Sequence, residues 1–297
     1  MIKPALAAIA TFAVAATAVL TGCGDDAESS TPLPGNHVQV NGLDMYYEVH
    51  GQSSDEPPLV LLHGALSGIG TDFGDLIPVL SENRQVIAIE QQAHGRTADI
   101  DRPLRTEFMA DDTVALLKQI GVEKADIFGY SMGAGVALDI GLRHSDVVRK
   151  LVLLSVGLSP EGLHPGVLDG ITQIQPEMLH GSPFHNDYLA NAPRPEDFPT
   201  LVAKVKEMDA NPPTFPADAV AAMTAPTLTI IADSDIVRPE HAVEIFRLRG
   251  GGIMGDTPAG LPDSELAVLP GASHVTGVHR PELLAPMITT FLDRPTN

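Results

Sequence analysis

The sequence predicts an α/β protein in which a mostly parallel sheet of about eight strands is covered by helices on both faces. Short, wholly apolar runs alternate along the chain with segments of helical periodicity, and such runs suit strands that are buried on both faces. The 297 residues are 44% hydrophobic and 19% charged, the composition of a globular chain that can bury one large core. We therefore expect one large domain, preceded by a segment of different character.

That first segment has the pattern of a targeting signal. Lys3 supplies a positive start, and residues 5–20 are uncharged and apolar but too short and too rich in alanine for a membrane span. The run ends in Leu20-Thr21-Gly22-Cys23, which resembles the bacterial lipoprotein signal. An alternative cleavage after Ala16-Thr17-Ala18 would instead release a secreted, soluble protein.

The lipoprotein resemblance implies three further expectations. Residues 1–22 would be a signal peptide, Cys23 would carry lipid, and the polar residues 23–36 would be a tether. The mature protein would then be anchored in the cell envelope, outside the cytoplasm, with the membrane as a partner through that lipid.

Charge and cysteine content exclude several classes of function. Thirty-eight acidic against 18 basic residues give a net charge of -20, which repels nucleic acid, so no nucleic-acid partner is expected. A single cysteine rules out an intrachain disulfide and a zinc site built on several thiolates. Because no H-E-x-x-H pair occurs either, we expect neither a metal nor a cofactor.

The domain is expected to begin with an antiparallel hairpin at the edge of the sheet, made of residues 38–40 and 43–49 around the turn pair Asn41-Gly42. Apolar runs predict the remaining strands at 59–62, 86–89, 125–128, 151–154, 228–231 and 266–269. Helices are predicted over 72–82, 106–120, 134–142 and 281–292, the last kinked at Pro286.

Two segments interrupt this alternation. Residues 157–225 are rich in proline and contain only scattered helical patches, so they predict an insertion over the carboxyl ends of the strands, where it would form a lid. Aromatic residues such as Phe184 and Phe215 favour packing over a disordered linker. Residues 249–264 are a second insertion, before the last strand, and the sequence suggests no chemical role for it.

Gly129-Tyr130-Ser131-Met132-Gly133 lies between a predicted strand and a predicted helix. This G-x-S-x-G pattern in that context is typical of a nucleophile elbow, a strained turn that exposes the serine while the glycines let neighbouring backbone pass closely. A serine in an ordinary glycine-rich turn is the alternative. No lysine follows the glycines, as a P-loop requires.

The chain from about His37 to residue 297 resembles the α/β-hydrolase family, in particular its lidded bacterial serine esterases. The resemblance rests on the elbow and on motifs listed in chain order: Leu62-His63-Gly64-Ala65, Ala232-Asp233-Ser234-Asp235 and Pro270-Gly271-Ala272-Ser273-His274. Nucleophile, acid and histidine follow one another in the family's order.

The resemblance implies a catalytic triad. Ser131 would be the nucleophile, and because a serine hydroxyl reacts poorly at neutral pH, it needs a base, His274, oriented by a carboxylate. Matching to the family places that carboxylate at Asp235, with Asp233 as a turn former. Glu161, which follows the preceding strand, is a third candidate because some relatives recruit the acid there.

The resemblance also implies an oxyanion hole formed by the backbone N–H groups of Met132 and Ala65. Ala65-Leu66 replaces the later glycines of the lipase H-G-G-G motif, which disfavours bulky tertiary-alcohol substrates.

The predicted function is therefore a serine hydrolase that cleaves a small ester, uncharged or cationic, through an acyl-enzyme. Perhydrolysis and carbon–carbon hydrolysis use the same triad and stay open. From other classes, a catalytically silent ligand-binding lipoprotein or a structural envelope lipoprotein remain alternatives, although the latter leaves the elbow unexplained. The sequence does not indicate the oligomeric state.

Overall fold

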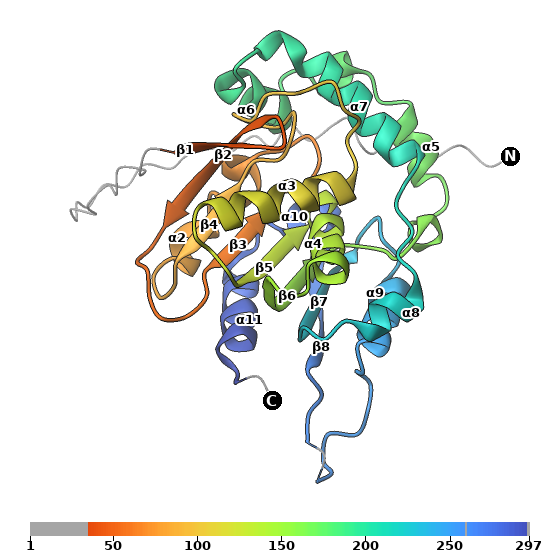
Figure 1. Ribbon diagram of the computed structural model, residues 1–297. Helices are drawn as coiled ribbons and strands as arrows, with labels where there is room; N and C mark the ends of the chain where they lie inside the picture. Colours follow the sequence, from red (N-terminus) through yellow and green to blue (C-terminus); the bar gives the residue numbers. More distant parts are fainter. Residues whose placement is uncertain (1–34, 259, 296–297) are drawn as a thin grey trace, which may run out of the picture.

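The computed structural model describes residues 35–258 and 260–295. Its eight strands form one sheet in the order β1-β2-β4-β3-β5-β6-β7-β8, parallel from β4 to β8, which confirms the predicted fold class (Figure 1). The strands are β1 Asn36–Val40, β2 Leu43–His50, β3 Leu59–Leu62, β4 Val86–Ile89, β5 Ala125–Tyr130, β6 Val148–Leu154, β7 Thr227–Ser234 and β8 Ser264–Ser273.

The antiparallel hairpin at the edge turns at the predicted residue pair. Val40 and Leu43 face each other across it, and Asn41 and Gly42 have φ angles of 50° and 87°. Consecutive positive φ angles are the requirement of the hairpin turn whose twist matches that of the strands, and Asn-Gly meets it at little cost. Strand β2 then pairs antiparallel with β4 and joins the hairpin to the sheet.

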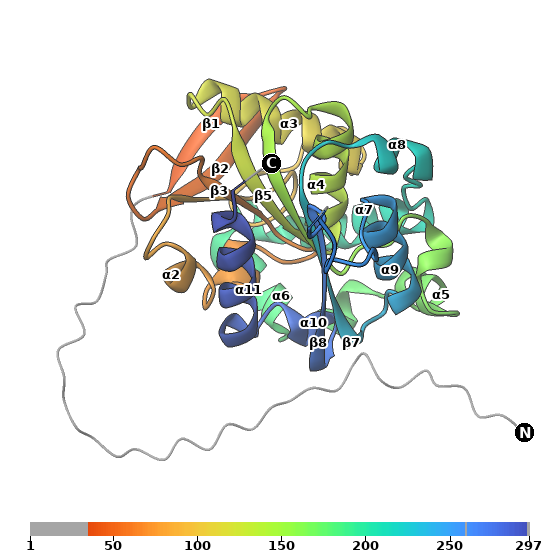
Figure 2. The ribbon, with the colours of Figure 1, turned by 90° about the horizontal axis from the view of Figure 1, so that it is seen from below.

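The sheet separates two hydrophobic cores because side chains alternate between its faces. In β3, for example, Val60 and Leu62 belong to the core under α3 and α4, whereas Leu59 and Leu61 belong to the core under α1, α2 and α11. Figure 2 shows α2 and α11 on one side of the sheet and α3, α4 and α9 on the other. Burial on both faces explains why the strand has no polar residue.

The helices on the two faces are α1 Ile69–Phe73, α2 Ile77–Leu80, α3 Thr106–Gln119, α4 Met132–Arg143, α9 Pro239–Leu248, α10 His274–Gly277 and α11 Pro281–Asp293. The single helix predicted over 72–82 was wrong, since two short helices occupy this region. Pro78 has no N–H to donate to the carbonyl of Gly74, which disfavours one helix through these residues, and it lies instead in the first turn of α2, where no such donor is needed. Helix α11 continues through Pro286.

Helices, and no further strands, fill the chain between β6 and β7. They are η1 Pro160–Gly162, α5 Val167–Thr172, η2 Pro176–Leu179, α6 Pro183–Asn191, η3 Pro195–Asp197, α7 Phe198–Ala210 and α8 Ala217–Ala222. In Figure 1, α5, α6 and α7 run along the top of the molecule. We call residues 155–226 the helical insertion. Its residues Phe198, Val205 and Phe215 are buried and share a core with Met132 of α4.

The second predicted insertion is a long loop at the amino end of β8 (Figure 1). It leaves Ile253, Met254 and Leu261 exposed. Arg249, at its start, donates hydrogen bonds to the carbonyl oxygens of Val220 and Ala225, which fastens α9 to the end of the helical insertion.

The predicted signal peptide 1–22, the lipidation site Cys23 and nearly all of the tether 23–36 lie outside the described residues. Within residues 35–258 and 260–295, no helix combines the length and the apolar character that crossing a membrane requires.

Candidate active site

The candidate site lies at the carboxyl ends of the parallel strands. From β3 the chain crosses to β4 on one side of it, and β5 then pairs with β3 on the other side. The loops that follow β3 and β5 therefore diverge, and such a switch point is where open α/β sheets bind ligands. Ala65 follows β3, Ser131 follows β5, and Asp235 and His274 follow β7 and β8.

Ser131 occupies a strained turn between β5 and α4, with φ 54° and ψ -117°. Residues other than glycine rarely adopt this backbone conformation, which costs about 1 to 3 kcal/mol. The two flanking glycines make the turn possible. A Cβ atom on Gly129 would lie 2.1 Å from the carbonyl oxygen of Gly133, and one on Gly133 would lie 2.0 Å from that of Leu62.

Three side chains form a hydrogen-bonded chain at this position. The Ser131 Oγ lies 2.9 Å from His274 Nε2, and His274 Nδ1 lies 2.7 Å from Asp235 Oδ1. The side chain of Asp235 is fully buried, and that of His274 is 14% exposed. When Nδ1 carries the proton and donates it to the carboxylate, Nε2 is free to accept the hydroxyl proton of Ser131.

Asp235 is held by more than His274. Its Oδ2 accepts a hydrogen bond of 2.5 Å from the Ser155 hydroxyl, and its Oδ1 accepts one of 3.1 Å from the Val237 amide. Burial alone would raise the pKa of Asp235, but the hydrogen bond and charge of His274, helped by Ser155 and Val237, bring this pKa below its ordinary value. Asp235 is therefore an ionised acceptor for the histidine at neutral pH.

The backbone of His274 is fixed at the junction of β8 and α10. Ser273 caps the short helix by accepting a hydrogen bond from the Thr276 amide. The hydroxyl of Tyr130 donates to the carbonyl oxygen of His274, at 2.9 Å, and the rings of Tyr130 and His274 lie 5.5 Å apart. The residue before the nucleophile thus also positions the base.

The loop after β3 is held by a buried carboxylate. Asp72 accepts hydrogen bonds from the Gly64 amide at 2.7 Å and from the Ser67 hydroxyl at 2.6 Å. Burial raises the pKa of Asp72 to about 6, although both hydrogen bonds oppose the shift. Among the described residues, no hydrogen-bond acceptor is recorded for the N–H groups of Ala65 and Met132, so both amides are available to a ligand.

His63 and His94 support loops near the site. Nδ1 of each donates to a backbone carbonyl, and Nε2 of each accepts from a backbone amide, Gln91 for His63 and Leu66 for His94. Burial lowers the pKa of His63 to about 4 and that of His94 to about 3. Neutral rings with both nitrogens engaged are structural elements, not bases.

In the described structure, neither of the two alternative acids has a recorded hydrogen bond to His274. Asp233 is exposed and accepts hydrogen bonds from the amides of Gly271 and Ala272, so it shapes the turn before His274. Glu161 is exposed on η1. Over the residues that the structure describes, no group of three or more His, Cys, Asp or Glu side chains is arranged to hold a metal ion.

Sequence reasoning missed the residues that support the site. Ser155, with φ 61°, and Asp72 reach it through the tertiary fold, and no local motif marks them. Asp209, on α7, is a half-buried carboxylate whose pKa burial raises to about 6, against the charge of His274. Its signal was present in the sequence, as a charge at the end of the apolar periodicity of residues 198–208 and on the same helix face.

The sheet topology and the strained turn at Ser131 indicate the α/β-hydrolase class of protein. Comparison with known families gives the same class. Residues 57–276 match the alpha/beta hydrolase fold family. The chain belongs to this family and is a hydrolase of this fold.

Individual relatives are distant. A putative carbamate hydrolase, RutD, from Agrobacterium fabrum is 24% identical over 270 residues, which cover 84% of this chain and 98% of that protein. A 2-hydroxymuconate semialdehyde hydrolase from a Pseudomonas species is 33% identical over 106 residues, or 34% of this chain and 38% of that protein. The crystal structure of an enol-lactonase from Burkholderia xenovorans superposes with a TM-score of 0.66 at 16% identity, over 87% of this chain and 100% of that chain.

Proposed function

We propose that the protein is a serine hydrolase that cleaves a small carboxylic ester through an acyl-enzyme. The observation that carries the proposal is the continuous hydrogen-bonded chain from Ser131 through His274 to Asp235, at 2.9 and 2.7 Å. Its serine stands in a strained turn that only flanking glycines allow.

In the proposed reaction, Ser131 Oγ attacks the acyl carbon while His274 Nε2 takes the hydroxyl proton. Asp235 stabilises the imidazolium that forms. Collapse of the tetrahedral intermediate breaks the bond to the leaving group, which receives the proton from Nε2. A water molecule then attacks the acyl-enzyme, gives one proton to Nε2, and releases the acid while Ser131 regains its proton.

The negative oxygen of each tetrahedral intermediate needs hydrogen-bond donors. We assign the N–H groups of Ala65 and Met132 to this role, because the two amides have no recorded acceptor in the described structure and follow the two strands at the switch point. Donors that are already in place contribute strongly to acyl transfer. Asp72 supports the first of them by holding the adjacent Gly64 amide.

Hydrolysis of p-nitrophenyl acetate and butyrate by the purified full chain tests the proposal. Ser131→Ala should lower kcat by at least about 1,000-fold, whereas Ser81→Ala, at the far end of α2, should leave it unchanged. Hydrolysis that survives Ser131→Ala at the wild-type rate would refute the role of the serine.

A panel of substrates tests which class of bond the protein cleaves. The RutD relatives motivate an aryl carbamate, and the semialdehyde hydrolase motivates a carbon–carbon substrate. Amides and peroxide complete the set. We expect the highest kcat/KM on esters; a higher value on any other class would replace ester hydrolysis as the assigned reaction while leaving the triad in place.

We further propose that lipid on Cys23 anchors the domain to a membrane, which rests on the sequence motif Leu20-Thr21-Gly22-Cys23. Expression of the full chain in a bacterial host, followed by membrane fractionation, tests this. Wild type should sediment with membranes and Cys23→Ser should not; equal sedimentation of the two would contradict lipidation.

A further inference from the structure

Helix α7 of the helical insertion presents an apolar face to the core. Its buried residues are Phe198, Leu201, Val202, Val205 and Met208, each at most 8% exposed. They follow helical spacing and share one hydrophobic core with Met132, the residue after the candidate nucleophile. The inner face of α7 therefore packs into the core on the α3 and α4 side of the sheet.

Asp209 continues this apolar face. It lies four residues after Val205 and seven after Val202, where helical geometry places it on the same side. Its side chain is half-buried, whereas its neighbours Glu207 and Ala210 are exposed. An ionisable group thus occupies a position that the pattern of the helix assigns to an apolar residue.

Within residues 35–258 and 260–295, no hydrogen bond or ion pair to the Asp209 carboxylate is recorded. His274 is the ionisable group whose charge acts on it, which places the carboxylate near the base of the candidate triad. Burial raises the pKa of Asp209 to about 6, so the group is still mainly ionised at neutral pH.

A desolvated carboxylate without a partner is costly, and such a group calls for a counter-charge from outside the chain. His274 supplies one only transiently, when it holds the proton during the reaction. The net charge of -20 also raises the local concentration of cations and repels anions.

We propose that Asp209 is the binding group for a cationic substrate, an ester that carries a quaternary or protonated ammonium a few bonds from the carbonyl carbon. This proposal names the substrate class of the serine hydrolase and rests on that proposed function. The ammonium pairs with Asp209 on α7 while the ester carbonyl lies between Ser131 and the amides of Ala65 and Met132. In this arrangement the helical insertion recognises the positive charge of the substrate, and the residues at the carboxyl ends of the strands carry out the acyl transfer.

Two pairs of matched esters test the proposal, each differing only by a quaternary nitrogen in place of a quaternary carbon. Choline butyrate is compared with 3,3-dimethylbutyl butyrate, and p-nitrophenyl 4-(trimethylammonio)butyrate with p-nitrophenyl 5,5-dimethylhexanoate. The three proteins are wild type, Asp209→Asn and, as a matched control that removes a charge from the exposed face of the same helix, Glu207→Gln.

In at least one pair, we expect the kcat/KM ratio of cationic to neutral ester to fall by about 10-fold to 100-fold in Asp209→Asn and to persist in Glu207→Gln. The ratio corrects for the intrinsic reactivity of each ester. An unchanged ratio in both pairs would overturn the proposal, as would an equal fall in Glu207→Gln. An equal loss of kcat/KM on both members would mean that Asp209 acts on His274 instead, which also overturns it.

Binding of butyltrimethylammonium, followed by calorimetry, makes the inference independent of turnover. Asp209→Asn should weaken this binding about 10-fold or more, and Glu207→Gln should not. If wild type hydrolyses no ester but binds the cation through Asp209, the proposed function fails while the cation site stands. If wild type hydrolyses neutral esters and neither ratio nor binding depends on Asp209, the cation site fails while the proposed function stands.

Discussion

The two ends of the sheet treat buried charge in opposite ways. At the amino end, Lys150 is 2% exposed, yet its Nζ donates to the carbonyl oxygens of Phe291, Leu292 and Arg294. These carbonyls end α11, where a positive charge also suits the helix dipole. At the carboxyl end, Asp209 has no such set of partners among the described residues.

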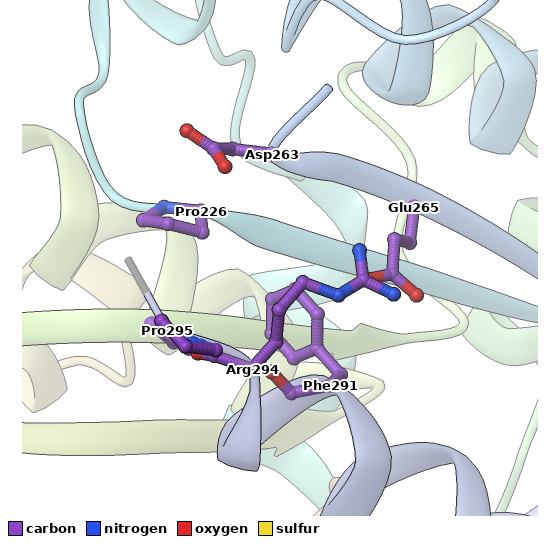
Figure 3. A pocket seen from close by; sticks show the side chains of 7 residues that line it. Pro226, Asp263, Glu265, Phe291, Arg294 and Pro295 are labelled. Carbon is purple, nitrogen blue, oxygen red and sulfur yellow. Dashed lines mark hydrogen bonds and ion pairs between the residues drawn. The ribbon is translucent and has the colours of Figure 1, made fainter. Parts of the chain in front are cut away.

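A small cavity lies beside Lys150 at this end of the sheet. Figure 3 shows Arg294 and Glu265 side by side at this cavity, and their side chains form an ion pair of 2.6 Å. The cavity has a volume of about 10 Å³, room for about one water molecule. A charge with all its hydrogen bonds made inside the chain has nothing left to offer a ligand. The comparison teaches that burial alone assigns no role to a charged group: the hydrogen bonds of Lys150 are made within the chain, whereas we propose that Asp209 pairs with a substrate.

The largest expected effect tests the carboxyl end. Asp235→Asn removes the ionised acceptor of His274 Nδ1, so the ring loses its orientation and its counter-charge. We expect kcat for p-nitrophenyl butyrate to fall about 1,000-fold to 10,000-fold with little change in the melting temperature. Asp233→Asn is the control, because that carboxylate accepts from the turn amides of Gly271 and Ala272 and makes no recorded hydrogen bond to His274. A greater loss in Asp233→Asn than in Asp235→Asn would exchange the two assignments.

The next effect tests the amino end. Lys150→Met removes the buried donor and leaves three carbonyl oxygens without it, so we expect a loss of about 3 kcal/mol in the free energy of unfolding, measured with urea. Because the site is remote, kcat/KM of the folded fraction should not change. The exposed Lys118→Met should alter neither quantity. A Lys150→Met protein with the wild-type free energy of unfolding but a lower kcat/KM would contradict a purely structural role for Lys150.

The smallest effect concerns His63, whose two ring nitrogens are both hydrogen-bonded to backbone groups near the candidate site. His63 has a pKa of about 4 in the folded protein and about 6.5 when unfolded. As the pH falls below 6.5, the unfolded chain takes up a proton that the folded chain does not, so His63 costs the protein stability there. Wild type should lose about 1 kcal/mol from this group between pH 7.5 and 5.5.

His63→Gln isolates that contribution. The substitution should destabilise the protein less at pH 5.5 than at pH 7.5, by that same amount, in urea denaturation at the two values. Taking the difference between the two proteins cancels the opposing titrations of Asp72 and Glu90, whose pKa values burial raises to about 6 and about 7. An equal cost at both pH values would show that His63 is not held neutral by the fold.

How far the sequence predicts the molecule depends on how local each signal is. Strands β3 and β4 and the Asn41-Gly42 turn follow from their own residues, and the structure has them at the predicted positions. Strand β8 extends past the predicted 266–269 to Ser273 because β7 continues to pair with it. The helix predicted over 72–82 is wrong because its apolar spacing does not reveal that Pro78 begins a separate short helix, α2.

The candidate site divides in the same way. The triad members each sit in a short motif after a strand, so the sequence alone could nominate them. Ser155 and Asp72 contact the site only because distant strands end side by side, which no spacing rule encodes. Asp209 belongs between these cases, since its helix is regular but the group that it faces is set by the fold.

Covalent labelling tests the central claim that Ser131, His274 and Asp235 act as one acyl-accepting unit. The purified full chain is treated with a fluorophosphonate, and the adduct is located by mass spectrometry of its peptides. We predict one adduct per chain, on Ser131, absent from Ser131→Ala and formed at least about 100-fold more slowly in Asp235→Asn. Two results would contradict the account: ester hydrolysis by a chain in which Ser131 stays unlabelled, or a labelling rate that is the same in Asp235→Asn as in wild type.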